Sequence, residues 1–216
     1  MVIPADDGRA SLRTRADGAT ELRVDGVFVM DDRETSSERL LARAFLDDAG
    51  GAGRVVVGGL GLGHTLRELL ADPRVREVVV AEIEPAVVRW MREGRVPGRD
   101  LLDDPRVDLR VADVRDVVAS LDAGSVDAVL LDVDNGPDYL VLASNAAVYG
   151  VPFLATCASR LRAGGLLCVW SMADSPAVRD ALAEFCDDVA AERVPVRLQG
   201  REESYWLLRG RARHGS

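Results

Sequence analysis

The sequence predicts an α/β protein whose core is a doubly wound, mostly parallel β-sheet. Short apolar runs rich in valine recur along the middle of the 216-residue chain, and each is followed by a stretch with helical spacing of apolar residues. The composition, with 48% hydrophobic and 29% charged residues, fits one hydrophobic core with a small accessory element. Alternating strands and helices imply parallel pairing, because each helix carries the chain back across the sheet.

The first 50 residues predict the accessory element. Three short strand-like runs are separated by Asp-Gly pairs, which is typical of a β-meander. The runs are 11–15, 21–24 and 27–30. A helix is expected over 34–48, since Leu40, Leu41, Ala44 and Phe45 recur at helical spacing before a glycine-rich break.

Residues 51–210 predict the main domain. The expected parallel strands are 55–57, 78–80, 107–111, 128–131 and 166–170, and the helices between and after them are 64–70, 85–93, 114–121, 151–161 and 176–191. Two closing strands, 194–198 and 205–209, flank Gln199-Gly200 and should add an antiparallel edge. Residues 211–216 are expected to form a flexible tail.

Composition excludes several classes of function. The net charge is -9, which argues against a nucleic-acid partner. All 27 basic residues are arginine, which rules out a P-loop lysine and a Schiff-base lysine. The three cysteines have uneven spacing, so we expect reduced core thiols and no metal site. No apolar run is long enough to cross a membrane and the N-terminus is acidic, so the expected location is the cytoplasm.

A glycine-rich turn is the strongest local signal for a ligand site. Gly58, Gly59, Gly61 and Gly63 stand between the first parallel strand and its helix, as in Rossmann-like folds, where backbone amides can approach a ligand. Glu82 lies 19 residues after Gly63 at a strand end, where a carboxylate can accept hydrogen bonds from ribose. His64 takes the place of the third glycine of the dinucleotide fingerprint, which disfavours NAD. The alternative is a tight turn without a ligand.

Acidic residues follow the next two strands. Asp113 follows strand 107–111 and could hold an exocyclic amine such as adenine N6, or cap the helix that begins at Val114. Asp132 ends strand 128–131 and opens a polar loop that contains Asp134 and Asn135. Because this loop lies at the same sheet edge, it is the predicted reaction-site loop.

The order of these motifs resembles that of the spermidine synthases over about residues 20–170. The matching segments are the glycine turn, Glu82-Ile83-Glu84-Pro85, the stretch from Asp104-Pro105 to Asp113, and the stretch from Asp132 to Tyr149-Gly150. The resemblance implies that the turn and Glu82 hold S-adenosylmethionine or its decarboxylated form without a metal. It also implies that Ile83 packs on adenine, that Asp113 binds its amine, and that Asp132 lies beside the aliphatic amino end. The family likeness further suggests a homodimer.

Neighbouring residues complete the predicted site. His64 and Val114 adjoin the cofactor motifs and are included among the cofactor-binding residues; His64 could equally be a neutral polar contact. Asp132, Asp134, Asn135 and Tyr149 are the candidate catalytic residues, although Asp134 could be a turn cap and Tyr149 could simply anchor its loop. Trp90, Trp170 and Trp206 are predicted to pack in the core.

Three positions depart from the spermidine synthase pattern. Leu62 and Asn135 replace family Asp residues, and Ser36-Ser37 replaces a Tyr-His pair. An amide such as that of Asn135 does not titrate near neutral pH and is no useful base. The sequence therefore predicts adenosyl-sulfonium-dependent group transfer to a small acceptor, with methylthioadenosine or S-adenosylhomocysteine as product, but not authentic spermidine synthesis. The alternatives are a cyclase or lyase that releases methylthioadenosine, and a non-catalytic adenosyl-ligand-binding regulator.

Overall fold

The computed structural model describes residues 2–4, 9–47, 53–133, 135–198 and 201–213. Its main sheet has seven strands in the order β10-β11-β9-β8-β5-β6-β7. Five of them are parallel: β5 (Gly53–Gly58), β6 (Val75–Glu82), β7 (Val107–Val111), β8 (Val126–Leu131) and β9 (Leu161–Ser171). The last two, β10 (Cys186–Leu198) and β11 (Arg201–Ala212), are antiparallel and extend one edge. This confirms the predicted Rossmann-like α/β fold class.

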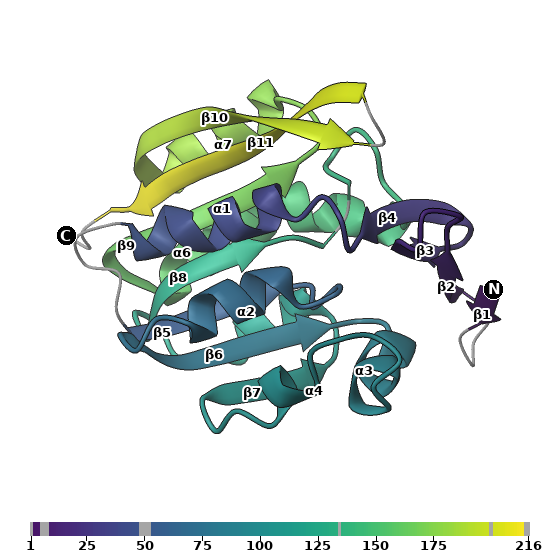
Figure 1. Ribbon diagram of the computed structural model, residues 1–216. Coiled ribbons are helices and arrows are strands. Elements are labelled where there is room, and N and C mark those ends of the chain that lie inside the picture. The colour runs from purple at the N-terminus through teal and green to yellow at the C-terminus, as the bar shows by residue number, and fades with distance from the viewer. Residues whose placement is uncertain (1, 5–8, 48–52, 134, 199–200, 214–216) are drawn as a thin grey trace.

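Helices cover both faces of this sheet (Figure 1). One apolar cluster joins the sheet to α1 (Ser36–Leu46), α2 (His64–Leu70), α3 (Pro85–Arg92) and α4 (Arg99–Leu102). The other joins it to α5 (Val114–Ala119), the 3-10 helix η1 (Ala143–Tyr149), α6 (Val151–Arg160) and α7 (Pro176–Phe185). Val55 and Val57 belong to the first cluster and Val56 to the second, because successive strand residues point to opposite faces. The uniformly apolar strands are thus buried on both sides.

A separate N-terminal sheet lies beyond the carboxyl ends of the parallel strands (Figure 1). Its strands are β1 (Val2–Pro4), β2 (Ala10–Thr14), β3 (Thr20–Val24) and β4 (Val27–Asp31), paired in chain order and antiparallel. The three predicted strands are present, and β1 adds a fourth. Asp25 and Gly26 both have positive φ, 50° and 77°, as a tight hairpin between β3 and β4 requires.

Two predictions near the C-terminus are wrong. The expected helix 176–191 ends at Phe185, and the chain turns directly into β10. Residues 186–191 pair with β11 instead, across a register shift at 187–190 where Asp188 has a φ of 53°, so tertiary pairing overrides the local helical pattern. The expected tail begins too early, because Arg211 and Ala212 belong to β11 and Arg213 donates to the backbone carbonyls of helix α7. Residues 214–216 lie outside the described residues.

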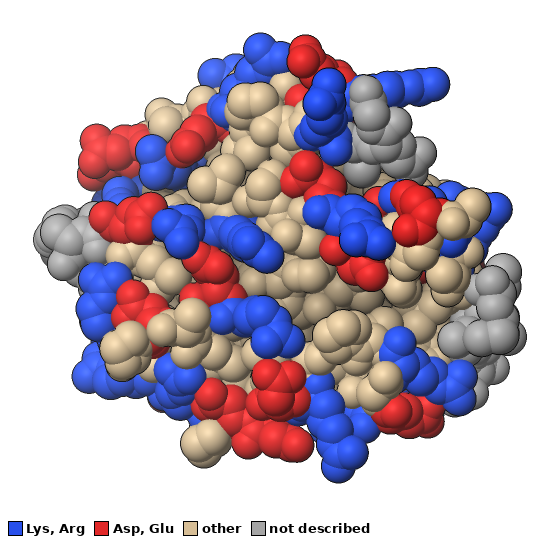
Figure 2. Space-filling view, in the orientation of Figure 1, with Lys and Arg blue, Asp and Glu red and all other residues tan. Residues whose placement is uncertain are grey.

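Charged side chains of both signs are mixed over the face shown in Figure 2. Many pair locally along the chain, as in the Asp72–Arg74 and Asp104–Arg106 ion pairs of 2.7 Å and 2.8 Å. Such pairing breaks the surface into small neutral patches rather than one extended field. In the described part of the chain, no helix combines the length and apolar character needed to cross a bilayer.

Candidate functional site

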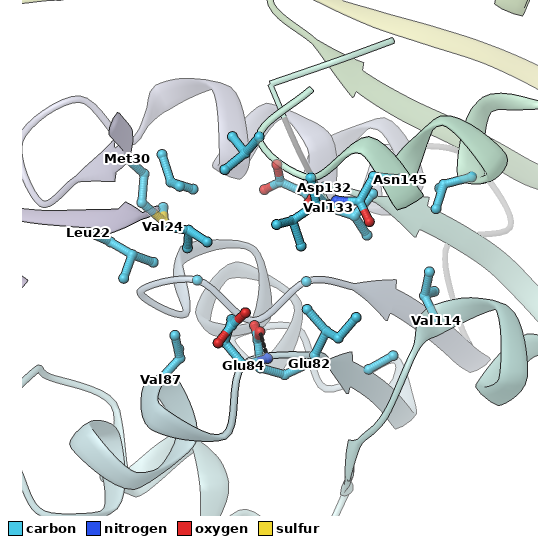
Figure 3. Close-up of a pocket in the computed structure, with 18 of the residues that line it drawn as sticks. Leu22, Val24, Met30, Glu82, Glu84, Val87, Val114, Asp132, Val133 and Asn145 are labelled. Atoms are coloured by element: carbon cyan, nitrogen blue, oxygen red, sulfur yellow. Dashed lines mark hydrogen bonds between the residues drawn. The ribbon is translucent and has the colours of Figure 1, made fainter. Parts of the chain in front are cut away.

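A pocket opens where the carboxyl ends of β5, β6 and β8 face the N-terminal sheet (Figure 3). Its lining combines acidic and amide side chains with an apolar majority, and no Lys, Arg or His side chain of the described residues contributes to it. The acidic and amide members are Glu38, Glu82, Glu84, Asp113, Asp132, Asn135 and Asn145. The crevice at this edge is where doubly wound folds bind ligands.

The glycine turn forms part of the pocket floor through Gly59 and Gly61. Gly59 has a φ of 94°, and a Cβ there would lie 2.0 Å from the carbonyl oxygen of Asp132. Gly61 has a φ of 51°, and a Cβ there would lie 2.5 Å from Sδ of Met30. Glycine is required at Gly59 because the backbone is left-handed and a backbone oxygen is too close for a side chain; at Gly61 the backbone is also left-handed, and a side chain would have to displace Met30.

Four amides of this turn bond to the protein itself, and the Gly59 and Gly63 N–H groups donate to the carbonyls of Ala81 at 2.8 Å and Leu60 at 2.9 Å. The Leu60 N–H donates to Oε2 of Glu82 at 2.9 Å, and the Leu62 N–H donates to Sδ of Met30 at 3.2 Å. Leu62 is itself buried in the core. The expectation that turn amides approach a ligand therefore does not hold for these four groups, which instead fix the shape of the turn.

Glu82, at the end of β6, is 6% exposed and lines the pocket. Its Oε1 accepts the Glu84 N–H at 2.8 Å, while Oε2 accepts the Leu60 N–H. Burial raises its pKa above the ordinary value, and the backbone N–H groups oppose part of that rise. The backbone N–H groups of Gly61 and Ile83 also act on this carboxylate, so the protein itself uses much of its acceptor capacity and less is left for a ligand. The adjacent Glu84 is buried and forms an ion pair with Arg9 at 3.3 Å.

Asp132 and Glu38 bring two more carboxylates to the pocket. Asp132 ends β8, and burial followed by the nearby charges of Glu38 and Glu82 raises its pKa to about 8. Glu38 lies in the first turn of α1, accepts a 2.8 Å hydrogen bond from the Ser37 hydroxyl, and has its pKa raised chiefly by burial. We call Glu38, Glu82, Glu84 and Asp132 the carboxylate cluster.

Glu38 and Trp170 are site residues that sequence reasoning missed. A signal for Glu38 was present, because it lies three residues before Leu41 and seven before Phe45, on the apolar face of its helix. A carboxylate on a core-facing stripe is unusual and marks a buried polar function. Trp170, predicted as a packing residue, lines the pocket near the end of β9, with its ring centroid 4.7 Å from that of Tyr205.

The predicted adenine end is assembled by Ile83, Asp113 and Val114, all of which line the pocket. Asp113 also caps α5, as the alternative prediction held: its Oδ1 accepts the Arg115 N–H at 2.8 Å. The Arg115 side chain lies 2.6 Å from its Oδ2 and, as the main cause, holds the pKa of Asp113 below its ordinary value. Ile83 is 43% exposed, so its apolar side chain is available to a planar ring.

The structure separates the other candidate residues. Asn135 is buried and lines the pocket, but its Nδ2 donates to the Phe28 carbonyl at 3.2 Å, which ties the loop after β8 to β4. Asp134 lies outside the described residues. Tyr149 packs in the apolar cluster with α5, α6 and α7 and is not among the residues that line the pocket, so a catalytic role for it stays a prediction.

His64, Gly58 and Gly63 are also absent from the pocket lining. His64 opens α2, and its pKa is lowered mainly by burial and then by Arg39 and Arg67. Gly58 ends β5 and Gly63 precedes α2, so both shape the turn rather than face the pocket. These three residues therefore flank the pocket, and their contact with a cofactor stays a prediction.

The fold and the acidic pocket define a Rossmann-like protein with a crevice suited to a cationic ligand. Residues 54–196 match the model of the spermine/spermidine synthase domain, and the chain belongs to that family, as its motifs predicted. It is 34% identical over 161 residues to the polyamine aminopropyltransferase of Mycobacterium tuberculosis (strain ATCC 25618 / H37Rv), covering 72% of this chain and 29% of that protein.

Two further comparisons extend this result. Putrescine N-methyltransferase 4 of Nicotiana tabacum is 31% identical over 117 residues, covering 53% of this chain and 28% of that protein. The crystal structure of spermidine synthase from Thermotoga maritima superposes with a TM-score of 0.76 at 15% identity, covering 98% of this chain and 71% of that one, which supports the fold. The chain spans less than half the length of the sequence relatives it matches.

Proposed function

We propose that this chain binds an adenosyl sulfonium, with decarboxylated S-adenosylmethionine preferred over S-adenosylmethionine, and transfers a carbon group from it to a small amine. The observation that carries the proposal is the carboxylate cluster in a pocket whose described lining has no basic side chain. A cation gains from these charges, whereas a pyrophosphate would be repelled, which also argues against NAD.

The residues present fit such a ligand. Ile83 offers an apolar surface to the base, Asp113 an acceptor for an exocyclic amine, and Glu82 an acceptor for ribose hydroxyls. The tail would lie toward Glu38 and Asp132. A tail carboxylate would meet like charge there, and the nearby Leu62 N–H is already taken by Met30. Decarboxylated S-adenosylmethionine, which lacks this tail carboxylate, should therefore bind more tightly than S-adenosylmethionine.

Asp132 is the proposed base. Its pKa of about 8 lies near the neutral range in which a general base is most effective, and its carboxylate faces the pocket. When bound, the sulfonium supplies an electrophilic carbon: a nitrogen–carbon bond forms as the carbon–sulfur bond breaks, and sulfur keeps the electron pair as a neutral thioether. Asp132 accepts the proton that the amine loses, while Trp170 and the N-terminal sheet exclude water.

Calorimetric titration tests the proposal directly. We expect decarboxylated S-adenosylmethionine to bind at least about tenfold more tightly than S-adenosylmethionine, which corresponds to about 1.4 kcal/mol. The variant Glu38→Gln removes one cluster charge and should narrow this difference in affinity. Glu68→Gln changes a carboxylate of α2 that pairs with Arg43 and does not line the pocket, and it should leave the difference unchanged. Equal affinity for the two compounds, or no binding of either, would contradict the proposal.

Product analysis then separates transfer from the alternatives. With an amine present, transfer should release methylthioadenosine together with a larger amine. Methylthioadenosine without a modified amine would identify a cyclase or lyase, and binding without any product would identify a regulator. Either outcome would overturn the transfer step while leaving the ligand site in place. Size-exclusion chromatography with light scattering would check the homodimer expected from the family.

A further inference from the structure

The carboxylates of the pocket differ in how far they are already engaged. Both oxygens of Glu82 accept backbone N–H groups, and Glu84 is paired with Arg9. Glu38 accepts the Ser37 hydroxyl at 2.8 Å and is buried. Among the described residues, only the Asp132 carboxylate in this cluster receives neither a hydrogen bond nor an ion pair from the protein. One position in the pocket is therefore available to pair closely with an amine.

The wall that the N-terminal sheet presents to this position is apolar. Leu22 and Val24 of β3 and Val29 and Met30 of β4 line the pocket, and no charged residue of that sheet does so among the described residues (Figure 3). In the close-up, the labelled Leu22, Val24 and Met30 lie on the side away from Val114, which marks the predicted adenine end. The wall therefore borders the part of the pocket that remains for an acceptor.

Two contacts hold this wall in place. The thioether of Met30 accepts the Leu62 N–H of the glycine turn, and the carbonyl of Phe28 accepts the Asn135 side-chain amide. Strand β4 is thereby joined to the glycine turn and to the loop that follows β8. An acceptor must adapt to this apolar surface, since the strand cannot move away without breaking both bonds.

We propose that the acceptor amine carries a single ammonium group on an apolar body, rather than two or more ammonium groups. Its nitrogen would pair with Asp132, and its hydrocarbon part would lie on the wall of Leu22, Val24 and Val29. A second ammonium at that wall would be buried without a partner, which is far costlier than burying methylene groups. This inference rests on the proposed function, whose adenosyl ligand occupies the rest of the pocket.

A matched pair of amines tests the inference by binding rather than by turnover. The protein is first saturated with methylthioadenosine, and n-hexylamine or 1,6-diaminohexane is then titrated by calorimetry. The two compounds have the same chain length and differ in the second ammonium. We expect n-hexylamine to bind at least about tenfold more tightly. Equal or tighter binding of the diamine would overturn the inference.

A substitution in the wall should reverse the preference. Val29→Glu places a carboxylate in the apolar wall, and we expect the ratio of diamine to monoamine affinity to rise at least about tenfold. Val29→Gln is the control of equal length without charge and should leave the ratio near that of the wild-type protein. An unchanged ratio in a folded Val29→Glu protein would count against the wall as the determinant. The wild-type comparison remains decisive if that variant does not fold.

The two proposals fail in different ways. If methylthioadenosine itself does not bind, the adenosyl site is wrong and the proposed function falls. If it binds and the diamine is preferred, the proposed function stands and only the acceptor class is wrong.

Discussion

Replacing Glu82 tests the central carboxylate of the site as a structural element. Its two oxygens connect the glycine turn to the segment that follows β6, through the Leu60 and Glu84 N–H groups at 2.9 Å and 2.8 Å. The side chain is 6% exposed, so water cannot readily replace it. Glu82→Ala would leave both donors buried and unpaired.

The magnitude follows from these two bonds. Each buried donor left without an acceptor costs about 1–3 kcal/mol, so Glu82→Ala should lower the free energy of unfolding by about 2–6 kcal/mol. Glu82→Gln keeps one carbonyl oxygen that can accept a hydrogen bond, but its NH2 group faces the other backbone N–H and cannot accept from it. We therefore expect about half of that decrease in the free energy of unfolding. The glutamine variant also removes a buried charge, which separates the acceptor role from the charge.

Urea unfolding at 25 °C, followed by circular dichroism, measures these differences. The adenosyl site should be affected in the same variants, because the shape of the glycine turn depends on Glu82; methylthioadenosine affinity is the second measurement. A Glu82→Ala protein with a free energy of unfolding within about 0.5 kcal/mol of the wild type, the range of ordinary surface changes, would refute the reasoning.

Two other predictions concern the pocket. Asp132 has a folded-state pKa of about 8, above its ordinary 3.8, so the native state retains a proton that the unfolded state loses and stability should fall as pH rises from about 4 to about 8. Asp132→Asn should remove much of this decrease in stability with pH, so the variant should be roughly 1–3 kcal/mol more stable than the wild type at pH 8. If urea unfolding shows the same change of unfolding free energy with pH in both proteins, the prediction is wrong. Gly61→Ala should destabilise more than Gly94→Ala by about 1–3 kcal/mol, since both have positive φ but only Gly61 has Met30 at 2.5 Å from the new Cβ. Equal melting temperatures of the two variants would show that Met30 moves aside freely.

The acidic strand ends were predictable because their positions depend on local order. Glu82, Asp113 and Asp132 each follow an apolar run, and parallel strands bring such residues to one edge of the sheet. The prediction for Asp113 left two roles open, and the structure shows the helix cap. Asp132 was expected to act beside the reacting end, but its raised pKa could not be predicted, because it depends on burial and on Glu38 from a distant helix.

Other candidate residues lie outside the pocket lining because sequence adjacency does not determine the direction of a side chain. Tyr149 and His64 follow predicted pocket motifs directly, yet neither lines the pocket, and Tyr149 packs among the apolar side chains around α6. The end of the expected helix 176–191 forms a strand for a related reason, because its structure depends on a partner that is distant in the sequence. Its pairing partner, β11, is brought beside it only when the hairpin docks on β9.

The sequence by itself determined the fold class, the glycine turn and the row of acidic strand ends, because strand burial and turn conformation depend on patterns within a few residues. Only the tertiary structure decided which carboxylates are engaged and what faces them. Met30 of β4 contacts the glycine turn, Asn135 after β8 contacts Phe28 of β4, and Glu38 of α1 acts on Asp132. Each of these contacts joins segments that are far apart in the chain. Such contacts arise from packing between elements, and they give the pocket its charge and its apolar wall.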